Sequence, residues 1–247
     1  MRPEVDWTGR EAEPITLRGG AQALGLGLSD AQYRCIERYL ELLQRWNRVY
    51  NLTAVRDPQE MLQQHVLDVL AILPPLLARG LLRLPKPCPS NQGLVVEPAP
   101  ATERMARPKT RLADLGSGAG LPGLILAIAC SELQLMSIEP VGKKCAFQQQ
   151  VAAELALTDV EIIQKRAEQV QANVDLIVSR ALTSLADLIQ ISSGLIGTGV
   201  PLLAMKGRQQ EVDAELQALP AEWSAEVIPV WVPGLKAERH LVLLNRP

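Results

Sequence analysis

Cysteine and histidine are scarce in this sequence, and their scarcity limits the metal chemistry open to it. The 247 residues include four cysteines and two histidines, and no two cysteines form a Cys-x-x-Cys pair. A structural zinc site needs four such ligands at characteristic spacings. We therefore expect no metal site, and we interpret the cysteines as reduced thiols of a cytoplasmic protein.

Aromatic residues and long apolar runs are also few. One Phe, three Tyr and four Trp argue against an aromatic-lined pocket for a small apolar substrate. No uninterrupted apolar run approaches the roughly 18 residues that span a bilayer. Residues 1–14 are acidic and polar, unlike the basic and then apolar start of a signal peptide. We expect a protein that is neither secreted nor bound to a membrane.

The sequence lacks the basic excess of proteins that hold nucleic acid by charge alone. Its formal net charge is −2, so any RNA contact must come from local patches. Each basic cluster, taken alone, fits a solvated surface equally well. The clusters are Arg104, Arg107, Lys109 and Arg111; Lys143 and Lys144; Lys165 and Arg166; and Lys206 and Arg208.

Two helix-start signals lie in the N-terminal third. Ser29-Asp30-Ala31-Gln32 matches a capping box, and apolar residues at helical spacing then predict a helix that ends near Tyr50. Asp57-Pro58-Gln59-Glu60 predicts the start of a second helix, which runs to Leu73. We interpret residues 25–82 as a helical appendage.

Two segments carry no regular pattern. Residues 1–24 form a polar N-terminal extension. Residues 83–110 contain six prolines among Ser, Asn, Gln and Gly, which is typical of a long linker or loop. The basic residues of this stretch fit an RNA-contacting arm, but its composition favours a disordered loop.

Residues 111–247 predict a doubly wound, Rossmann-like α/β domain with a mostly parallel, seven-stranded sheet. Short apolar runs alternate there with helical patterns, as in successive βαβ units. The last two strands are separated by Pro233-Gly234 and should pair antiparallel. The expected strands are 111–115, 134–139, 160–164, 174–179, 201–205, 226–232 and 239–244.

The strongest local signal is the glycine run from Asp114 to Gly123, Asp-Leu-Gly-Ser-Gly-Ala-Gly-Leu-Pro-Gly. It lies between an expected strand and an apolar helix that begins near Leu121. Glycines let the backbone turn tightly and come close to a ligand. In an open α/β sheet the end of the next strand supplies an acid for a ribose, and Glu139 ends that strand. These positions favour a nucleotide-like ligand over a purely structural turn.

A nicotinamide dinucleotide is the alternative ligand. Gly118-x-Gly120-x-x-Gly123 matches G-x-G-x-x-G, and Glu139 lies 21 residues past Gly118. The run, however, opens earlier than a dinucleotide motif, with Asp114 at the strand end. The closing antiparallel pair is also more typical of methyltransferases than of dehydrogenases.

An ordered set of motifs then resembles one family closely. The chain is similar to the bacterial 16S ribosomal RNA guanine-N7 methyltransferases, RsmG, also called glucose-inhibited division protein B. The likeness covers about residues 25–80 and 111–245. The motifs are Tyr50-Asn51-Leu52-Thr53-Ala54-Val55-Arg56-Asp57, His65-Val66-Leu67-Asp68, the glycine run, Arg166-Ala167-Glu168, Val178-Ser179-Arg180-Ala181, Met205-Lys206-Gly207 and Glu238-Arg239-His240-Leu241-Val242.

The resemblance implies a class I methyltransferase that uses S-adenosyl-L-methionine. Its implied reaction is methylation of N7 of a guanine in the 530 loop of 16S rRNA, with the small ribosomal subunit as partner. A methyltransferase that acts on a small molecule or a protein stays open as an alternative. We expect a cytoplasmic monomer.

Seven residues are expected to bind the cofactor. The resemblance places Gly116 and Leu121 in the cofactor pocket, Ala167 and Glu168 beside the adenosine, and Arg180 at its border. The glycine run adds Gly118, and the strand end adds Glu139. Physically, Glu139 and Glu168 are acceptors for ribose and adenine, and Arg180 suits the methionine carboxylate or a phosphate.

No general base is expected. Guanine N7 bears a free lone pair and no proton, so methyl transfer requires alignment rather than deprotonation. His65 and Asp68 share one face of the second helix, with Met61, opposite an apolar face. They suggest a catalytic dyad, but a histidine merely oriented by a neighbouring carboxylate is favoured. The substrate-side candidates are Asn51, His65 and Lys206.

Overall fold

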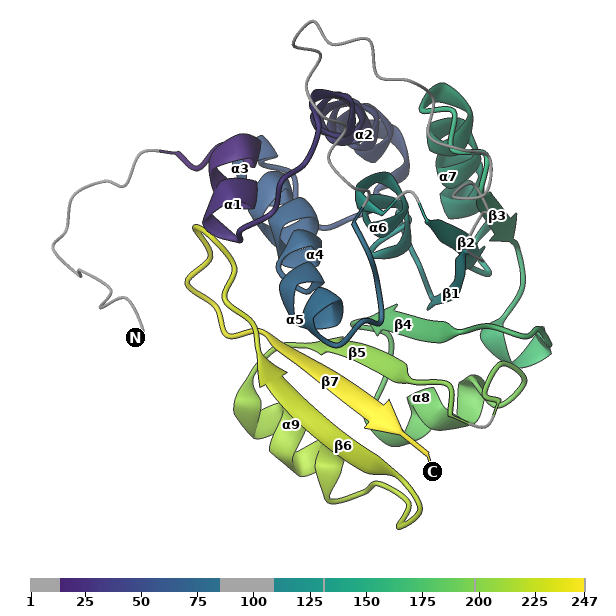
Figure 1. Cartoon of the computed structure of the whole chain (residues 1–247). Helices are drawn as coiled ribbons and strands as arrows, with labels where there is room; N and C mark the ends of the chain where they lie inside the picture. Colours follow the sequence, from purple (N-terminus) through teal and green to yellow (C-terminus); the bar gives the residue numbers. More distant parts are fainter. Residues whose placement is uncertain (1–13, 85–108, 131, 198, 247) are drawn as a thin grey trace, which may run out of the picture.

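The computed structural model describes residues 14–84, 109–130, 132–197 and 199–246. Within them, seven strands form one sheet in the order β3-β2-β1-β4-β5-β7-β6 (Figure 1). β1 to β5 run parallel, and β7 is antiparallel to both β5 and β6. The strands are β1 (Thr110–Leu115), β2 (Leu133–Ile138), β3 (Val160–Ile163), β4 (Leu176–Arg180), β5 (Leu202–Lys206), β6 (Ser224–Pro229) and β7 (His240–Asn245).

The predicted fold class and closing antiparallel pair are confirmed. Each strand lies within about two or three residues of its expected position. Short apolar runs mark the central strands, which are covered on both faces. The register pairs Leu115 with Ile138 and with Ser179, so the carboxyl ends of β1, β2 and β4 meet at one edge. Gly116, Glu139 and Arg180 therefore lie together.

A short helix, α1 (Leu17–Ala23), lies inside the segment expected to be a polar extension. Thr16 caps it by accepting a hydrogen bond from Gly19 N at 3.0 Å. The sequence did not predict this helix because it contains Gly19 and Gly20, and glycine disfavours helices. Gly20 is needed for packing, because a Cβ there would lie 2.5 Å from a methyl carbon of Leu67.

The long helix α2 (Asp30–Tyr50) begins with the predicted capping box and ends where expected. The second helix, expected to end at Leu73, is divided into three parts, and a fourth helical element continues from Leu73. They are α3 (Pro58–Met61), the π-helical η1 (Leu62–Leu67), α4 (Asp68–Leu70) and α5 (Leu73–Ala78).

Both faces of this helix are buried. Met61, His65 and Asp68 are only 1%, 6% and 4% exposed, as deeply buried as the apolar face. The π turn changes which residues share a face. Pro58–Ala78 is long and apolar enough to cross a membrane, but 67% of its most apolar window is buried against the protein, so it is a core helix here.

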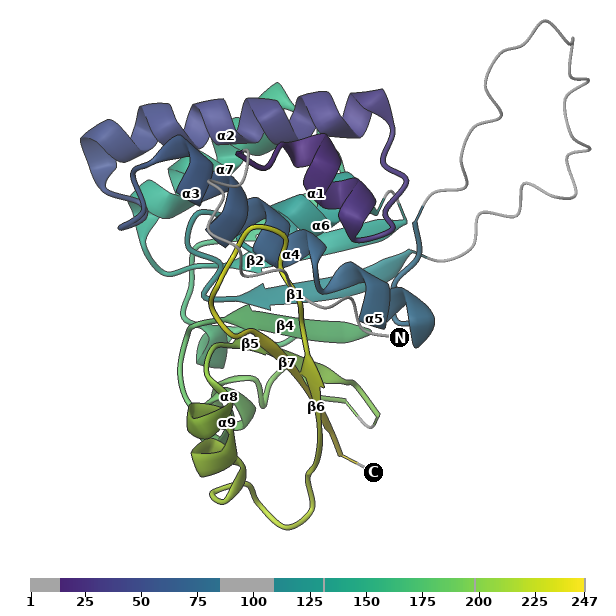
Figure 2. The same cartoon turned by 90° about the vertical axis from the view of Figure 1, so that its left-hand side faces the viewer.

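Helices cover both faces of the sheet (Figures 1 and 2). The N-terminal helices share one core with α6 (Gly123–Ala129), α7 (Gly142–Glu154) and one face of the sheet. The 3₁₀ turn η3 (Ala167–Gln169), α8 (Leu185–Ile191) and α9 (Gln209–Leu216) cover the other face. The expected linker lies almost wholly outside the described residues, and so do Arg104 and Arg107. Lys109, which is described, forms an ion pair with Asp159.

Candidate active site

The glycine run forms a tight loop between β1 and α6. Gly116, Gly118 and Gly120 have φ values of 65°, 59° and 78°, a region that glycine adopts without strain. A Cβ on Gly118 would meet only Gly116 O, at 3.9 Å. The backbone at Gly118 therefore borders open space that a ligand can approach. The helix begins at Gly123 rather than near Leu121.

Glu139 lies directly after β2, as predicted, and fastens this loop. Its carboxylate is 3% exposed, and it accepts hydrogen bonds from Gly118 N at 2.8 Å and Val141 N at 2.9 Å. An ionised carboxylate offers about four acceptor positions. Lys144 Nζ lies 3.9 Å from Oε2, and the remaining acceptor positions suit the hydroxyls of a ribose.

A buried polar cluster under the loop was missed by the sequence reasoning. The Gln148 side-chain amide donates to Ser117 Oγ and to Gly118 O, each at 2.8 Å. Ser137 Oγ lies 2.7 Å from Ser117 Oγ and 2.5 Å from Gln148 Oε1. All three side chains are buried, so the loop is held from beneath as well as by Glu139. A serine in the middle of the apolar β2 was the available signal.

Asp114, the acid that opens the run, is fully buried. Its Oδ2 accepts a hydrogen bond from Gly123 N at 2.8 Å, whereas Oδ1 has no partner among the described residues. Burial raises the pKa of this carboxyl to about 7. A buried acceptor without a partner beside a ligand loop fits a bound group that donates a hydrogen bond.

Exposed apolar side chains flank the glycine loop. Val141 and Leu182 are 39% and 41% exposed. Leu182 lies close to Gly116, since a Cβ built on Gly116 would come within 2.5 Å of a methyl carbon of Leu182. Ala167 is nearly buried and Glu168 is exposed, in the turn after β3. Leu121 is 4% exposed and packs into the core that contains the N-terminal helices.

A cavity of about 320 Å³ lies beside the ends of β4 and β5, below the π-helical segment. Three cationic side chains and one carboxylate line it, so it suits an anionic or acceptor-rich guest. The lining residues are Gln64, His65, Asp68, Arg180, Ala181, Met205, Lys206, Gly207 and Arg239.

Asp68 orients two of these cations. Its Oδ1 accepts from Arg239 Nε at 2.9 Å, and its Oδ2 accepts from Arg180 Nη1 at 3.3 Å. Arg180 Nη1 also donates to Gln64 O at 2.8 Å. Burial raises the pKa of Asp68, and the two arginines oppose that shift. The sequence motif that contains Arg239 was recognised, but the contact between Arg239 and Asp68 could not be predicted from it.

His65 forms neither the suggested dyad nor the favoured pair with a neighbouring carboxylate. Its Nε2 lies 2.9 Å from Thr53 Oγ1, and its Nδ1 lies 3.5 Å from Arg180 Nη2. Because Arg180 lies between the ring and Asp68, both interpretations are wrong. A guanidinium only donates, so Nδ1 accepts and Nε2 carries the proton. Burial and Arg180 lower the pKa of His65 to about 4, so the ring is neutral at pH 7.

The other two substrate-side candidates differ in position. Lys206 lines the cavity, but its Nζ donates to Thr183 O at 2.7 Å and to both carboxylate oxygens of Glu215. Asn51 does not line the cavity. It ends α2 in the left-handed region, and its Oδ1 accepts from Arg56 at 2.8 Å.

Comparison with known proteins identifies the family. The model of the rRNA small subunit methyltransferase G family, GidB, matches residues 32–80 and 94–242. The chain belongs to this family. The resemblance found in the sequence is thereby confirmed, and membership decides against the dinucleotide alternative.

Relatives named ribosomal RNA small subunit methyltransferase G match almost the whole chain. The protein of Acidovorax sp. (strain JS42) is 43% identical over 230 residues, 93% of each chain. That of Azoarcus sp. (strain BH72) is 41% identical, over 93% of this chain and 95% of its own. Among solved structures, TrmN from Thermus thermophilus is 17% identical over 60% of this chain and 47% of its own, with a TM-score of 0.47. Family membership follows from the full-length relatives.

Proposed function

We propose that this protein transfers a methyl group from S-adenosyl-L-methionine to N7 of a guanine in the 530 loop of 16S rRNA, in the small ribosomal subunit of the cytoplasm. One observation carries the choice of N7. The cavity at the ends of β4 and β5 offers no free base, since the pKa of His65 is lowered to about 4 and two arginines hold the Asp68 carboxylate. N7 needs no deprotonation.

The residues around the glycine loop fit the proposed cofactor. When bound, it supplies an electrophilic methyl group on a sulfonium. Gly116 and Gly118 let the backbone approach it, and Glu139 keeps acceptor positions for ribose hydroxyls. Val141 and Leu182 offer apolar walls. Ala167, Glu168 and Leu121 stay proposed contacts of the adenosine side.

The cavity residues would hold the guanine and its phosphate. Arg180 and Arg239 are fixed by Asp68 before any substrate binds. Guanidinium groups pair well with guanine O6 and with phosphate oxygens. Both ring nitrogens of the neutral His65 are engaged by Thr53 and Arg180. This ring therefore shapes the cavity rather than moving a proton.

Cofactor binding is tested by thermal unfolding. S-adenosylhomocysteine should raise the melting temperature by mass action, and NAD should not. Gly116→Val should abolish the rise, because any side chain there strains the backbone and meets Leu182. Gly27→Val is the control, since nothing lies within 4 Å of a Cβ at that position. Protection by NAD instead would contradict the proposal.

The class of substrate is tested with labelled S-adenosyl-L-methionine. Small subunits from cells that lack the enzyme should accept label into 16S rRNA. Label on a protein, or on a small molecule alone, would show that the substrate is wrong while the family and fold stand.

A further inference from the structure

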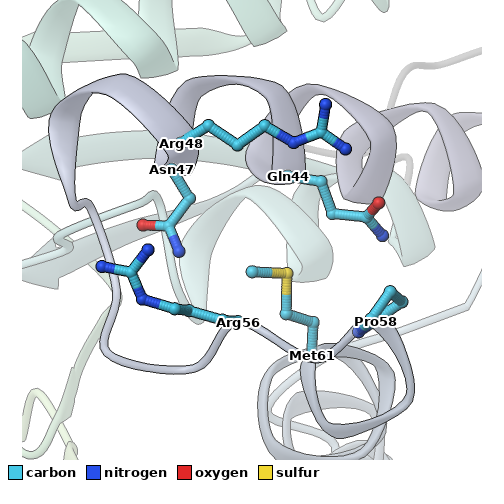
Figure 3. A pocket seen from close by; sticks show the side chains of 6 residues that line it. All are labelled: Gln44, Asn47, Arg48, Arg56, Pro58 and Met61. Carbon is cyan, nitrogen blue, oxygen red and sulfur yellow. The ribbon is translucent and has the colours of Figure 1, made fainter.

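A second hollow lies outside the cavity, between the last turns of α2 and the start of α3 (Figure 3). Its volume is about 240 Å³, below the range for drug-sized ligands but suited to a smaller unit. None of its residues lines the cavity at β4 and β5. The lining residues are Gln44, Asn47, Arg48, Arg56, Pro58 and Met61.

The floor and walls of this hollow combine apolar and polar surface. The Met61 side chain points toward α2 between Gln44 and Asn47 (Figure 3), and Pro58 forms one side. Asn47 Nδ2 donates to Val55 O at 3.1 Å, and its Oδ1 accepts from Thr53 N at 2.9 Å. Asn47 is therefore a fixed wall. The Gln44 amide has no hydrogen-bond partner among the described residues.

The two arginines at the rim are free of ion pairs within the described chain. Arg48 is exposed, with no carboxylate within 4 Å there. Arg56 is exposed and donates only to the neutral amide of Asn51, at 2.8 Å. By contrast, Arg180 and Arg239 are both paired with Asp68. In a protein of net charge −2, two uncompensated guanidinium groups at one hollow indicate an anionic ligand.

The hollow and the cavity lie on neighbouring residues of the same helix. Met61 lines the hollow, and His65, about one helical turn or roughly 5 Å further on, lines the cavity. Thr53 joins the two walls, since its backbone N–H donates to Asn47 and its hydroxyl contacts His65. A strand whose guanine enters the cavity would pass this hollow.

We propose that this hollow binds a nucleotide of the rRNA strand that flanks the methylated guanine. The guanidinium groups of Arg48 and Arg56 hold its phosphate, and its base lies over Pro58 with the Gln44 amide at its edge. This inference rests on the proposed function, because the ligand is part of the same RNA substrate.

The test compares Arg48→Ala/Arg56→Ala with Arg34→Ala, an exposed arginine of the same helix that is remote from the hollow. The probe is a fluorescent RNA hairpin that carries the 530 loop. The double variant should bind it at least about tenfold more weakly, with a log–log salt slope reduced by about one to two. Gln44→Ala should weaken binding without changing the slope. S-adenosylhomocysteine affinity should stay within twofold of wild type, whereas kcat/KM on small subunits should fall with the loss of RNA affinity.

Two results would overturn the inference alone. One is a double variant that binds the hairpin like Arg34→Ala while wild type binds and methylates rRNA. The other is loss of activity on small subunits with unchanged hairpin binding, which would assign the hollow to a ribosomal protein. If wild type transfers no methyl group to rRNA, the proposed function itself fails, and this inference fails with it.

Discussion

The Asp68 carboxylate accepts a hydrogen bond from Arg239 Nε at 2.9 Å, although 171 positions separate the two residues. The contact joins the π-helical region, deep in the helical layer, to the residue that precedes β7. Through its second oxygen, Asp68 also holds Arg180 at the end of β4. Three distant segments thus fix the cations of the cavity before substrate arrives.

Asp68→Asn should therefore impair catalysis more than folding. An amide keeps the shape of the side chain and one acceptor oxygen, so the variant should still fold, with a lower melting temperature because its pairs with Arg180 and Arg239 are weakened. The two guanidinium groups lose a charged acceptor worth about 1.5–3 kcal/mol, which corresponds to a loss of about 10- to 100-fold in kcat/KM. Steady-state methylation kinetics and thermal unfolding measure the two effects. Asp213→Asn, on the exposed face of α9, is the control, and equal kinetics for both variants would refute the role of Asp68.

At saturating S-adenosyl-L-methionine, the methylation rate should change little between pH 6.5 and 8.5. The pKa of His65 is lowered to about 4, so the ring stays neutral across this range and no other base is required. His65→Ala should lower the rate modestly, because Thr53 and Arg180 lose a positioning contact. A steep rise near pH 6.5 that disappears in His65→Ala would reveal a catalytic base.

Asp114→Asn should remove a pH-dependent loss of stability. The pKa of Asp114 is raised from 3.8 to about 7, so the folded state holds a proton that the unfolded chain has released. Wild type then loses stability as pH rises through this window, and the variant does not. The stability of the variant relative to wild type should grow by about 4 kcal/mol from pH 4 to pH 8 in urea unfolding. A difference that is constant with pH would mean that Asp114 titrates normally.

Lys206→Met should weaken cofactor binding rather than RNA binding. Lys206 Nζ holds Thr183 O and Glu215, and Glu215 accepts from Leu185 N at 2.7 Å. These bonds anchor the turn that carries Leu182 over Gly116. S-adenosylhomocysteine affinity should fall about three- to tenfold by calorimetry, while the salt slope of RNA binding matches that of the exposed control Lys236→Met. A slope reduced by one with normal cofactor affinity would instead place Lys206 on a phosphate.

Local patterns predicted most of the sheet and the ligand loop. Apolar runs locate strands, and parallel strands in register bring their ends together, so Gly116, Glu139 and Arg180 could be placed from sequence alone. Contacts between distant segments could not. Arg239, which pairs with Asp68, lies just before the last strand, β7. Glu215, which pairs with Lys206, lies on α9.

Two local features also escaped prediction, each for a physical reason. Helix α1 contains paired glycines, and one of them is required by close packing against Leu67. The π-helical turn Leu62–Leu67 departs from the 3.6-residue period on which face assignments depend. Arg180 lies between His65 and Asp68 and contacts both.

The most direct test of the central claim is the chemistry of the methylated base. Small subunits from cells that lack the enzyme would be incubated with the protein and S-adenosyl-L-methionine. A methyl group at N7 leaves guanine cationic, so borohydride reduction followed by aniline should cleave 16S rRNA at one site, in the 530 loop. A labelled RNA that resists this cleavage, or cleavage at another place, would contradict the account.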